Sequence, residues 1–172
     1  MRNSVLSILV LILAIAEVAT ARGTYQEPAD FVAETFGSST PETGAIWITK
    51  DLSEPIEDIL EHRFATRRVR YWIDGKRSAW ILDEIGKERP ITTGIVIDDG
   101  RIERIKVLVF RESRGWEVRH DFFTNQFRTA SLTPDLELDR TIDGVSGATL
   151  SVRALKKLAR VALFLSQQVS GD

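Results

Sequence analysis

Two tight turns, Asp74-Gly75 and Asp98-Asp99-Gly100, constrain the fold most strongly, because each lies between two runs of strand-forming residues. The first turn joins the two halves of RRVRYWIDGKRSAWILDEIG, and the second joins ITTGIVID to RIERIKVLVF. Asp-Gly between such runs is a strong signal for a β-hairpin, since both residues tolerate the positive φ of a hairpin turn. The pattern predicts four or five strands in a mostly antiparallel sheet.

Helical spacing dominates the chain outside these hairpins. A short strand is expected at residues 45–49 and a helix at 54–62, with Asp51 or Ser53 as its N-cap. After Arg111 the spacing of large aromatic residues favours a helix through Phe127, followed by a loop over 128–148. The last segment, LSVRALKKLARVALFLSQQ, is strongly amphipathic. We therefore expect an α+β domain over residues 45–172, with a C-terminal helix whose apolar stripe contains Ala154, Leu155, Leu158, Val161, Ala162 and Leu165.

The first residues have the pattern of a targeting signal. Arg2 precedes an apolar run, and Ala19-Thr20-Ala21 provides the small-x-small sequence that signal peptidase favours. We expect a signal peptide at 1–21, cleaved after Ala21, with a retained membrane anchor as the alternative. Residues 22–44 are rich in Gly, Ser, Thr, Glu and Pro, which predicts a flexible leader. The chain has no cysteine, so an exported protein of this kind fits a bacterial periplasm.

The stretch DGVSGATLS, residues 143–151, lies just before the C-terminal helix. The first N–H groups of a helix have no internal partner and its dipole favours negative charge, so a phosphate suits this position. Gly147 and Ala148 have little or no side chain, which lets the backbone approach a bulky ligand, and Thr149 offers a hydroxyl beside that gap. The residues alone are equally consistent with a helix cap formed by Ser146 or Thr149.

The pattern Asp143-x-x-Ser146-Gly147-Ala148-Thr149, followed by Leu150-Ser151, resembles the flavinylation motif of the FMN-binding domain family. That family includes the covalently flavinylated subunits of the sodium-translocating NADH:quinone oxidoreductase and of the related ferredoxin-oxidising complex. The resemblance implies that a flavin transferase joins the phosphate of FMN to the hydroxyl of Thr149 as a phosphodiester. It also implies a role for Asp143 in positioning Thr149 or the metal of the transferase. The cofactor-binding residues that it implies in this loop are Asp143, Ser146, Gly147, Ala148, Thr149, Leu150 and Ser151.

The resemblance extends over roughly residues 90–165. VLVFRESRGWEVRHDFFTNQF is similar to a family segment in which a strand ends at an acidic residue, followed by a Gly-containing turn and a helix with F..QF. Glu112 and Gly115 are then expected in the turn, and Glu112 and Trp116 close to the flavin ring. Trp116 stands where the larger complexes have a second turn glycine, so this chain departs from them there.

The resemblance implies an electron carrier that uses covalent FMN. No second cofactor, nicotinamide site or substrate-activating dyad is recognisable in the sequence, so an enzyme is not expected. The expected partners are the flavin transferase and a membrane electron donor or acceptor. Two alternatives remain open: an accessory binding module of a membrane redox complex without flavin turnover, and a flavin-dependent reductase.

Other candidate sites are weaker. The basic stretch RRVRYWIDGKR is expected to be a solvated hairpin face rather than a nucleic-acid site, because the net charge of the chain is −2. His120-Asp121 lacks the Gly-x-Ser-x-Gly element of a hydrolase, and two isolated histidines do not make a metal site. His62 and the basic face of the C-terminal helix are both expected to be solvated.

Overall fold

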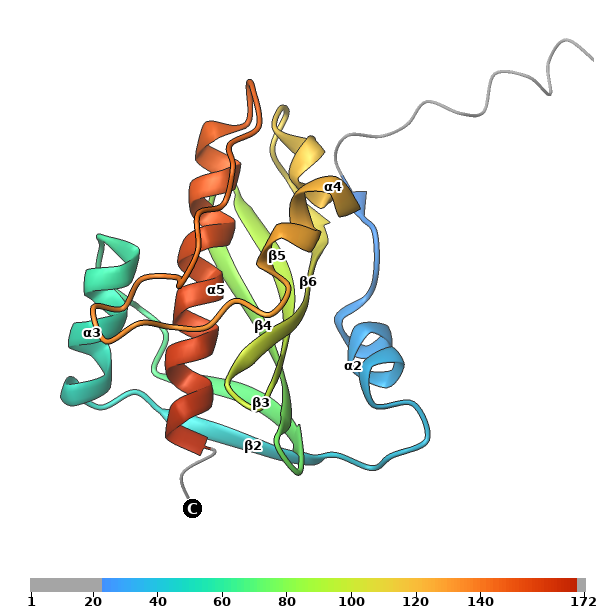
Figure 1. Cartoon of the computed structure of the whole chain (residues 1–172), viewed down its shortest axis with the longest axis vertical. Helices are drawn as coiled ribbons and strands as arrows, with labels where there is room; N and C mark the ends of the chain where they lie inside the picture. The colour runs from blue at the N-terminus through green and yellow to red at the C-terminus, as the bar shows by residue number, and fades with distance from the viewer. Residues whose placement is uncertain (1–22, 170–172) are drawn as a thin grey trace, which may run out of the picture.

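The computed structural model describes residues 23–169, and the proposed signal sequence lies outside them. Its elements are β1 (Gly23–Thr24), α2 (Pro28–Phe36), β2 (Glu42–Trp47), α3 (Lys50–Leu60), β3 (Arg68–Asp74), β4 (Arg77–Ile85), β5 (Pro90–Asp98), β6 (Arg101–Phe110), the short 3-10 turn η1 (Trp116–Arg119), α4 (Asp121–Thr124), η2 (Asn125–Phe127) and α5 (Thr149–Val169). Figure 1 shows α5 lying along the sheet, with its N-terminal end near α4.

The described strands form one antiparallel sheet in the order β1-β6-β5-β4-β3-β2. Both Asp-Gly turns close hairpins as predicted, β3–β4 and β5–β6, and Gly75 and Gly100 have positive φ. The expected α+β class, with antiparallel hairpins and a C-terminal helix after a loop, is confirmed.

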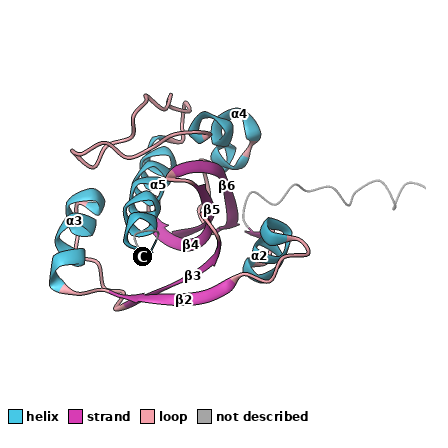
Figure 2. Ribbon diagram, turned by 60° about the horizontal axis from the view of Figure 1, so that its bottom comes forward, coloured by secondary structure: helices cyan, strands magenta, loops and turns pink. Residues whose placement is uncertain are grey.

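The main core lies between the sheet and α5. All six residues of the predicted apolar stripe on α5 are buried, and they pack with Trp80, Ile95 and Phe110 of the sheet. α3 packs beside α5 on the same side, whereas α2 covers the opposite face (Figure 2). The sheet is therefore covered on both faces over β4 and β5.

The expectation of a flexible leader at 22–44 is corrected by the structure, which places β1, α2 and the start of β2 within residues 23–44. The physical reason is that Phe31 and Phe36 provide apolar side chains that α2 buries against Ala79, Val96 and Leu108. Of the polar residues that suggested mobility, Glu34 is exposed on α2 and Ser38, Ser39 and Thr40 are exposed in the loop after it. Thr35, by contrast, is buried.

Element boundaries differ from the sequence expectations in three further places. The strand expected at 45–49 spans 42–47, and the helix expected at 54–62 begins at Lys50. Neither Asp51 nor Ser53 is its N-cap, because the N-cap is Thr49 and both residues lie inside the first turn, where the Ser53 hydroxyl donates to the Lys50 carbonyl. The helix expected to run through Phe127 is broken into η1, α4 and η2, although Phe123 and Phe127 are fully buried.

Candidate functional site: the loop at the start of α5

Residues 143–148, here called the motif loop, lead directly into α5, which begins at Thr149. The sequence predicted a helix start at this point. The Val152 N–H donates to the Ala148 carbonyl at 2.9 Å, so Ala148 takes the N-cap position of the helix. Alanine has no side-chain acceptor, and the structure does not place Ser146 or Thr149 at the cap position. The first N–H groups of this 21-residue helix therefore have no side-chain cap from the N-cap residue.

Open space lies beside Gly147, two residues before Thr149. Gly147 has a φ of +79°, and a Cβ added to it would meet no heavy atom within 4 Å. Thr149 and Ser146 are exposed, and Leu150 is 40% exposed, whereas Ala148 is buried. The hydroxyl of Thr149 is thus accessible beside a loop that leaves room for a large group.

The turn at residues 111–116 packs directly against this helix start. Gly115 has a φ of +82°, and an added Cβ would lie 2.5 Å from the Ser151 hydroxyl oxygen and 3.4 Å from Ala148. Only glycine fits a turn with this backbone conformation and this close approach. The two segments that the sequence singled out are therefore in contact in the fold.

Glu112 holds that turn in place. Its side chain is only 4% exposed, and its Oε1 atom accepts the backbone N–H groups of Lys87, Glu88 and Arg89 at 2.5, 2.7 and 2.9 Å. Burial raises the pKa of Glu112, but these three N–H donors outweigh it, so the net pKa lies below the ordinary value. The carboxylate is therefore charged, and it joins the β4–β5 connection to the 111–116 turn.

Trp116 follows Gly115 and is half-buried against the main core. Its ring contacts His120 edge-on at 5.2 Å between centroids, and the Arg119 guanidinium lies 5.1 Å from the Trp116 ring centroid. His120 in turn stacks on the exposed ring of Phe122. A row of aromatic rings thus begins at the turn and reaches the surface on α4.

One residue that sequence reasoning did not assign orders the start of the motif loop. Gln126 accepts the backbone N–H of Asp143 at 2.7 Å through its side-chain oxygen. Asp143 itself is exposed. The F..QF pattern marked this segment, and its glutamine now has a structural role as the anchor of the loop.

His62 is exposed, as expected, but its ring also makes a specific contact. The His62 Nε2 atom lies 3.0 Å from the buried carboxylate of Glu84, and the backbone contact to Arg63 together with Glu84 raises the pKa of His62.

The expectation of a solvated basic face on α5 holds for Arg153 but not for Lys157 and Arg160, which are partly buried. On the basic face of α5, Lys157 donates a hydrogen bond to the Leu60 carbonyl at the end of α3. Arg160 donates one to the Leu136 carbonyl in the loop before α5. These cations hold neighbouring segments onto α5.

The described residues contain no cluster of three or more His, Cys, Asp or Glu side chains that could hold a metal ion. No helix within residues 23–169 is long and apolar enough to span a bilayer. His120 and Asp121 are exposed at the start of α4, and no serine or threonine hydroxyl bonds the His120 ring within the described part of the chain.

A comparison with models of known families finds a match over the region that contains the 111–116 turn and the start of α5. Residues 86–163 match the model of the FMN-binding domain, and this segment includes Glu112, the turn, the motif loop and most of α5. The match supports flavin binding by this part of the chain. No curated protein and no solved structure matched the chain.

Proposed function

Because residues 86–163 match the FMN-binding domain, we propose that the chain is an exported electron carrier with FMN joined to Thr149 by a phosphodiester. The observation that carries the proposal is the start of α5, where the exposed Thr149 follows an alanine N-cap and a glycine with open space around it.

The residues present fit a phosphate at this position. The helix dipole and the uncapped N–H groups favour an anion beside Thr149. Gly147 leaves the approach open, since it has no side chain and even an added Cβ would meet no heavy atom within 4 Å. A phosphodiester retains one negative charge, which the same N–H groups stabilise after attachment.

Apolar groups near the turn suit a flat aromatic ring. Leu150 is exposed next to Thr149, and Trp116 is half-buried beside Gly115, whose turn contacts Ala148. Glu112 positions this turn through its hydrogen bonds to the β4–β5 connection. We therefore propose Trp116 as a ring contact and Glu112 as the residue that holds the contact surface.

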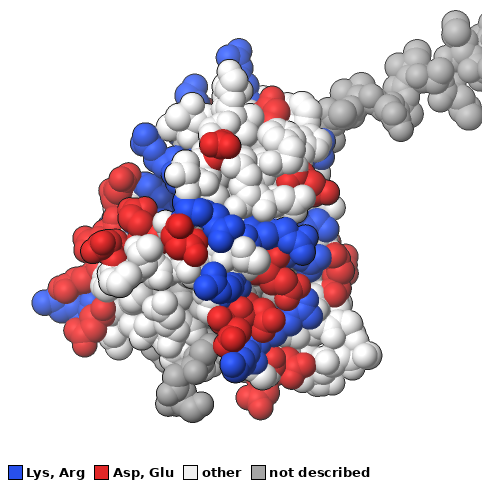
Figure 3. All heavy atoms as spheres, in the orientation of Figure 1, with Lys and Arg blue, Asp and Glu red and all other residues white. Residues whose placement is uncertain are grey.

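The exposure of the site supports a carrier role. Bound flavin accepts one or two electrons, and the protein supplies its position and surroundings. On the face seen in Figure 3, the upper end, which holds the start of α5, has fewer charges than the basic and acidic bands below it. A covalent tether keeps the cofactor on an exported protein and at high effective concentration near a membrane donor or acceptor.

The decisive test changes the attachment residue. After coexpression with a flavin transferase, Thr149→Ala should abolish covalent flavin, because it removes the oxygen nucleophile. Thr149→Ser should retain some attachment, because it loses only a methyl group. The measurement is flavin fluorescence in a denaturing gel, with peptide mass spectrometry across residues 141–153.

Thr141→Ala is the matched control, since Thr141 is an exposed hydroxyl in the same segment but lies outside the motif. It should leave the flavin mass unchanged. FMN found on Ser146 or Ser151, or a flavin-bearing Thr149→Ala protein, contradicts the assignment. Bound flavin that turns over with a nicotinamide or organic substrate without a partner protein would favour a reductase instead.

Export is a separate part of the proposal. The pattern of Arg2, an apolar run and Ala19-Thr20-Ala21 predicts that periplasmic protein begins at Arg22. N-terminal sequencing of the periplasmic fraction measures this directly. Recovery only in membranes, with Met1 intact, would replace the cleaved signal with an anchor.

A further inference from the structure

A hollow of about 340 Å³ lies beside the outer edge of β6, away from the motif loop. At one end of β6, β1 pairs with Val109 and Phe110, and the backbone N–H groups of the two residues that follow β1 donate to the Leu108 carbonyl. At the other end, Ile102 exchanges backbone hydrogen bonds with Thr129 and Ala130. Between these two points no described strand pairs with β6 on that side. The hollow occupies this gap, with α4 and its neighbours as the opposite wall.

Cationic side chains dominate the lining. It contains four, Arg104, Lys106, Arg119 and Arg128, against two carboxylates, Glu103 and Asp121. Excess positive charge in one hollow is unusual here, because the whole chain has a net charge of −2. The location therefore favours a negatively charged ligand.

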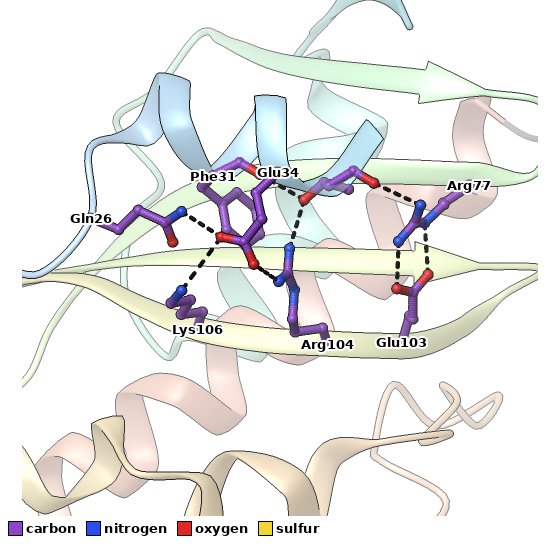
Figure 4. Close-up of polar contacts among 8 residues, drawn as sticks. Gln26, Phe31, Glu34, Arg77, Glu103, Arg104 and Lys106 are labelled. Carbon is purple, nitrogen blue, oxygen red and sulfur yellow. Dashed lines mark hydrogen bonds and ion pairs between the residues drawn. The ribbon is translucent and has the colours of Figure 1, made fainter. Parts of the chain in front are cut away.

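Part of this charge is already paired within the protein. Figure 4 shows Arg104 and Lys106 reaching toward Glu34 on α2, and Glu103 paired with Arg77. The Arg77–Glu103 pair is bidentate, at 2.6 and 2.7 Å, so Glu103 is not free to neutralise the hollow. Of the lining carboxylates, Asp121 is left to face the remaining cations.

Arg119 and Arg128 are the cations left for a ligand. Neither forms an ion pair with a carboxylate of the described residues, and the Nε atom of Arg119 is buried without an acceptor. The Arg119 guanidinium is held by two rings, 4.4 Å from the Tyr25 centroid and 5.1 Å from the Trp116 centroid. Cation–π contacts position the guanidinium without neutralising its charge.

We propose that this hollow binds a small organic anion, with a carboxylate or phosphate group held by Arg119 and Arg128. The planar fork of arginine matches both groups through paired N–H donors. The volume lies at the lower end of the range for small-molecule sites, so the ligand is compact. The site is independent of the proposed flavin linkage, although Arg119 contacts Trp116 and joins the two regions.

Isothermal titration calorimetry of the mature chain, with its flavin if attached, tests this at constant ionic strength. Succinate and inorganic phosphate are the two probes, and uncharged succinamide is the negative control. We expect saturable one-to-one binding with a Kd of about 1 mM or tighter for at least one anion and none for succinamide.

Arg119→Gln and Arg128→Gln should each weaken binding about tenfold or more, because each removes charge-assisted hydrogen bonds. Arg153→Gln is the matched control, since Arg153 is exposed on α5 and does not line the hollow. Arg128 is also exposed, so its variant stays informative if Arg119→Gln impairs folding. Absence of saturation with both anions overturns the proposal. Equal affinity in Arg128→Gln and Arg153→Gln does so too, because the anion then binds elsewhere.

Discussion

At the scale of single residues, Glu112 shows how a candidate site residue can act through structure. Its place after the strand suggested a contact with the flavin ring, but its Oε1 atom accepts three backbone N–H groups from residues 87–89. A buried carboxylate with this many donors costs little to keep charged. The residue therefore orders the turn that contacts the α5 start, and proximity of Glu112 to the ring stays a prediction.

Glu112→Ala should lower the free energy of unfolding by about 2–4 kcal/mol, because three buried N–H groups lose a charged acceptor. Glu112→Gln should cost less, since an amide oxygen still accepts. Urea unfolding at neutral pH measures both. Glu88→Gln is the control, because the Glu88 side chain is 70% exposed and should change stability little.

The same residue predicts a pH dependence. The folded pKa of Glu112 is lower than its ordinary value, so the charged form stabilises the fold above the unfolded pKa. This stabilisation is lost as the pH falls through the folded pKa. The stability difference between wild type and Glu112→Gln should therefore shrink on acidification. A difference that stays constant from neutral to acid pH would contradict a charged role for Glu112.

At the scale of elements, the contact between the 111–116 turn and the start of α5 defines the site. Gly115 and Gly147 both have positive φ, but of the two only Gly115 is crowded, because a Cβ added there would meet Ser151 and Ala148. The two glycines therefore separate two effects of adding a side chain. Backbone strain acts at both positions, and steric displacement of the turn acts at Gly115 alone.

Gly115→Ala should destabilise the protein more than Gly147→Ala. Strain in the left-handed region costs about 1–2 kcal/mol at either position, and the clash with Ser151 adds to it at Gly115. Because the clash moves the turn off the helix start, Gly115→Ala should also reduce flavin attachment. Thermal unfolding and in-gel flavin fluorescence of the two variants measure this, and equal losses of stability would show that packing at Gly115 is unimportant.

The same elements show which features of the fold could be predicted from the sequence. Asp-Gly turns and the apolar stripe of α5 predicted both hairpins and the last helix, because these signals are local. The three N–H bonds of Glu112, the His62–Glu84 pair and the ties made by Lys157 and Arg160 join residues more than 20 positions apart. No local pattern specifies such contacts, so they were not predictable from the spacing of residues. The family resemblance, by contrast, had already placed the turn and Thr149 near the same cofactor.

At the scale of the whole molecule, the sheet is covered by helices on two faces. The smaller of its two hydrophobic core clusters lies under α2. Phe31 is fully buried there, with Ala79, Val96 and Leu108. Gly94, in the middle of β5, makes room for it: an added Cβ would lie 2.6 Å from the Phe31 ring. A glycine inside a central strand is unfavourable by itself, and this close approach explains its presence.

Phe31 and Gly94 therefore predict a non-additive pair of substitutions. Phe31→Ala should destabilise by about 3–5 kcal/mol through loss of a buried ring. Gly94→Ala should cost about 1–3 kcal/mol in the wild type, because its methyl group overlaps that ring. In the Phe31→Ala background the overlap is gone and the methyl group enters the space left behind, so Gly94→Ala should cost nothing or stabilise. Urea unfolding of the four proteins completes the cycle. If Gly94→Ala costs the same in both backgrounds, Gly94 serves the backbone of β5 and not the packing of α2.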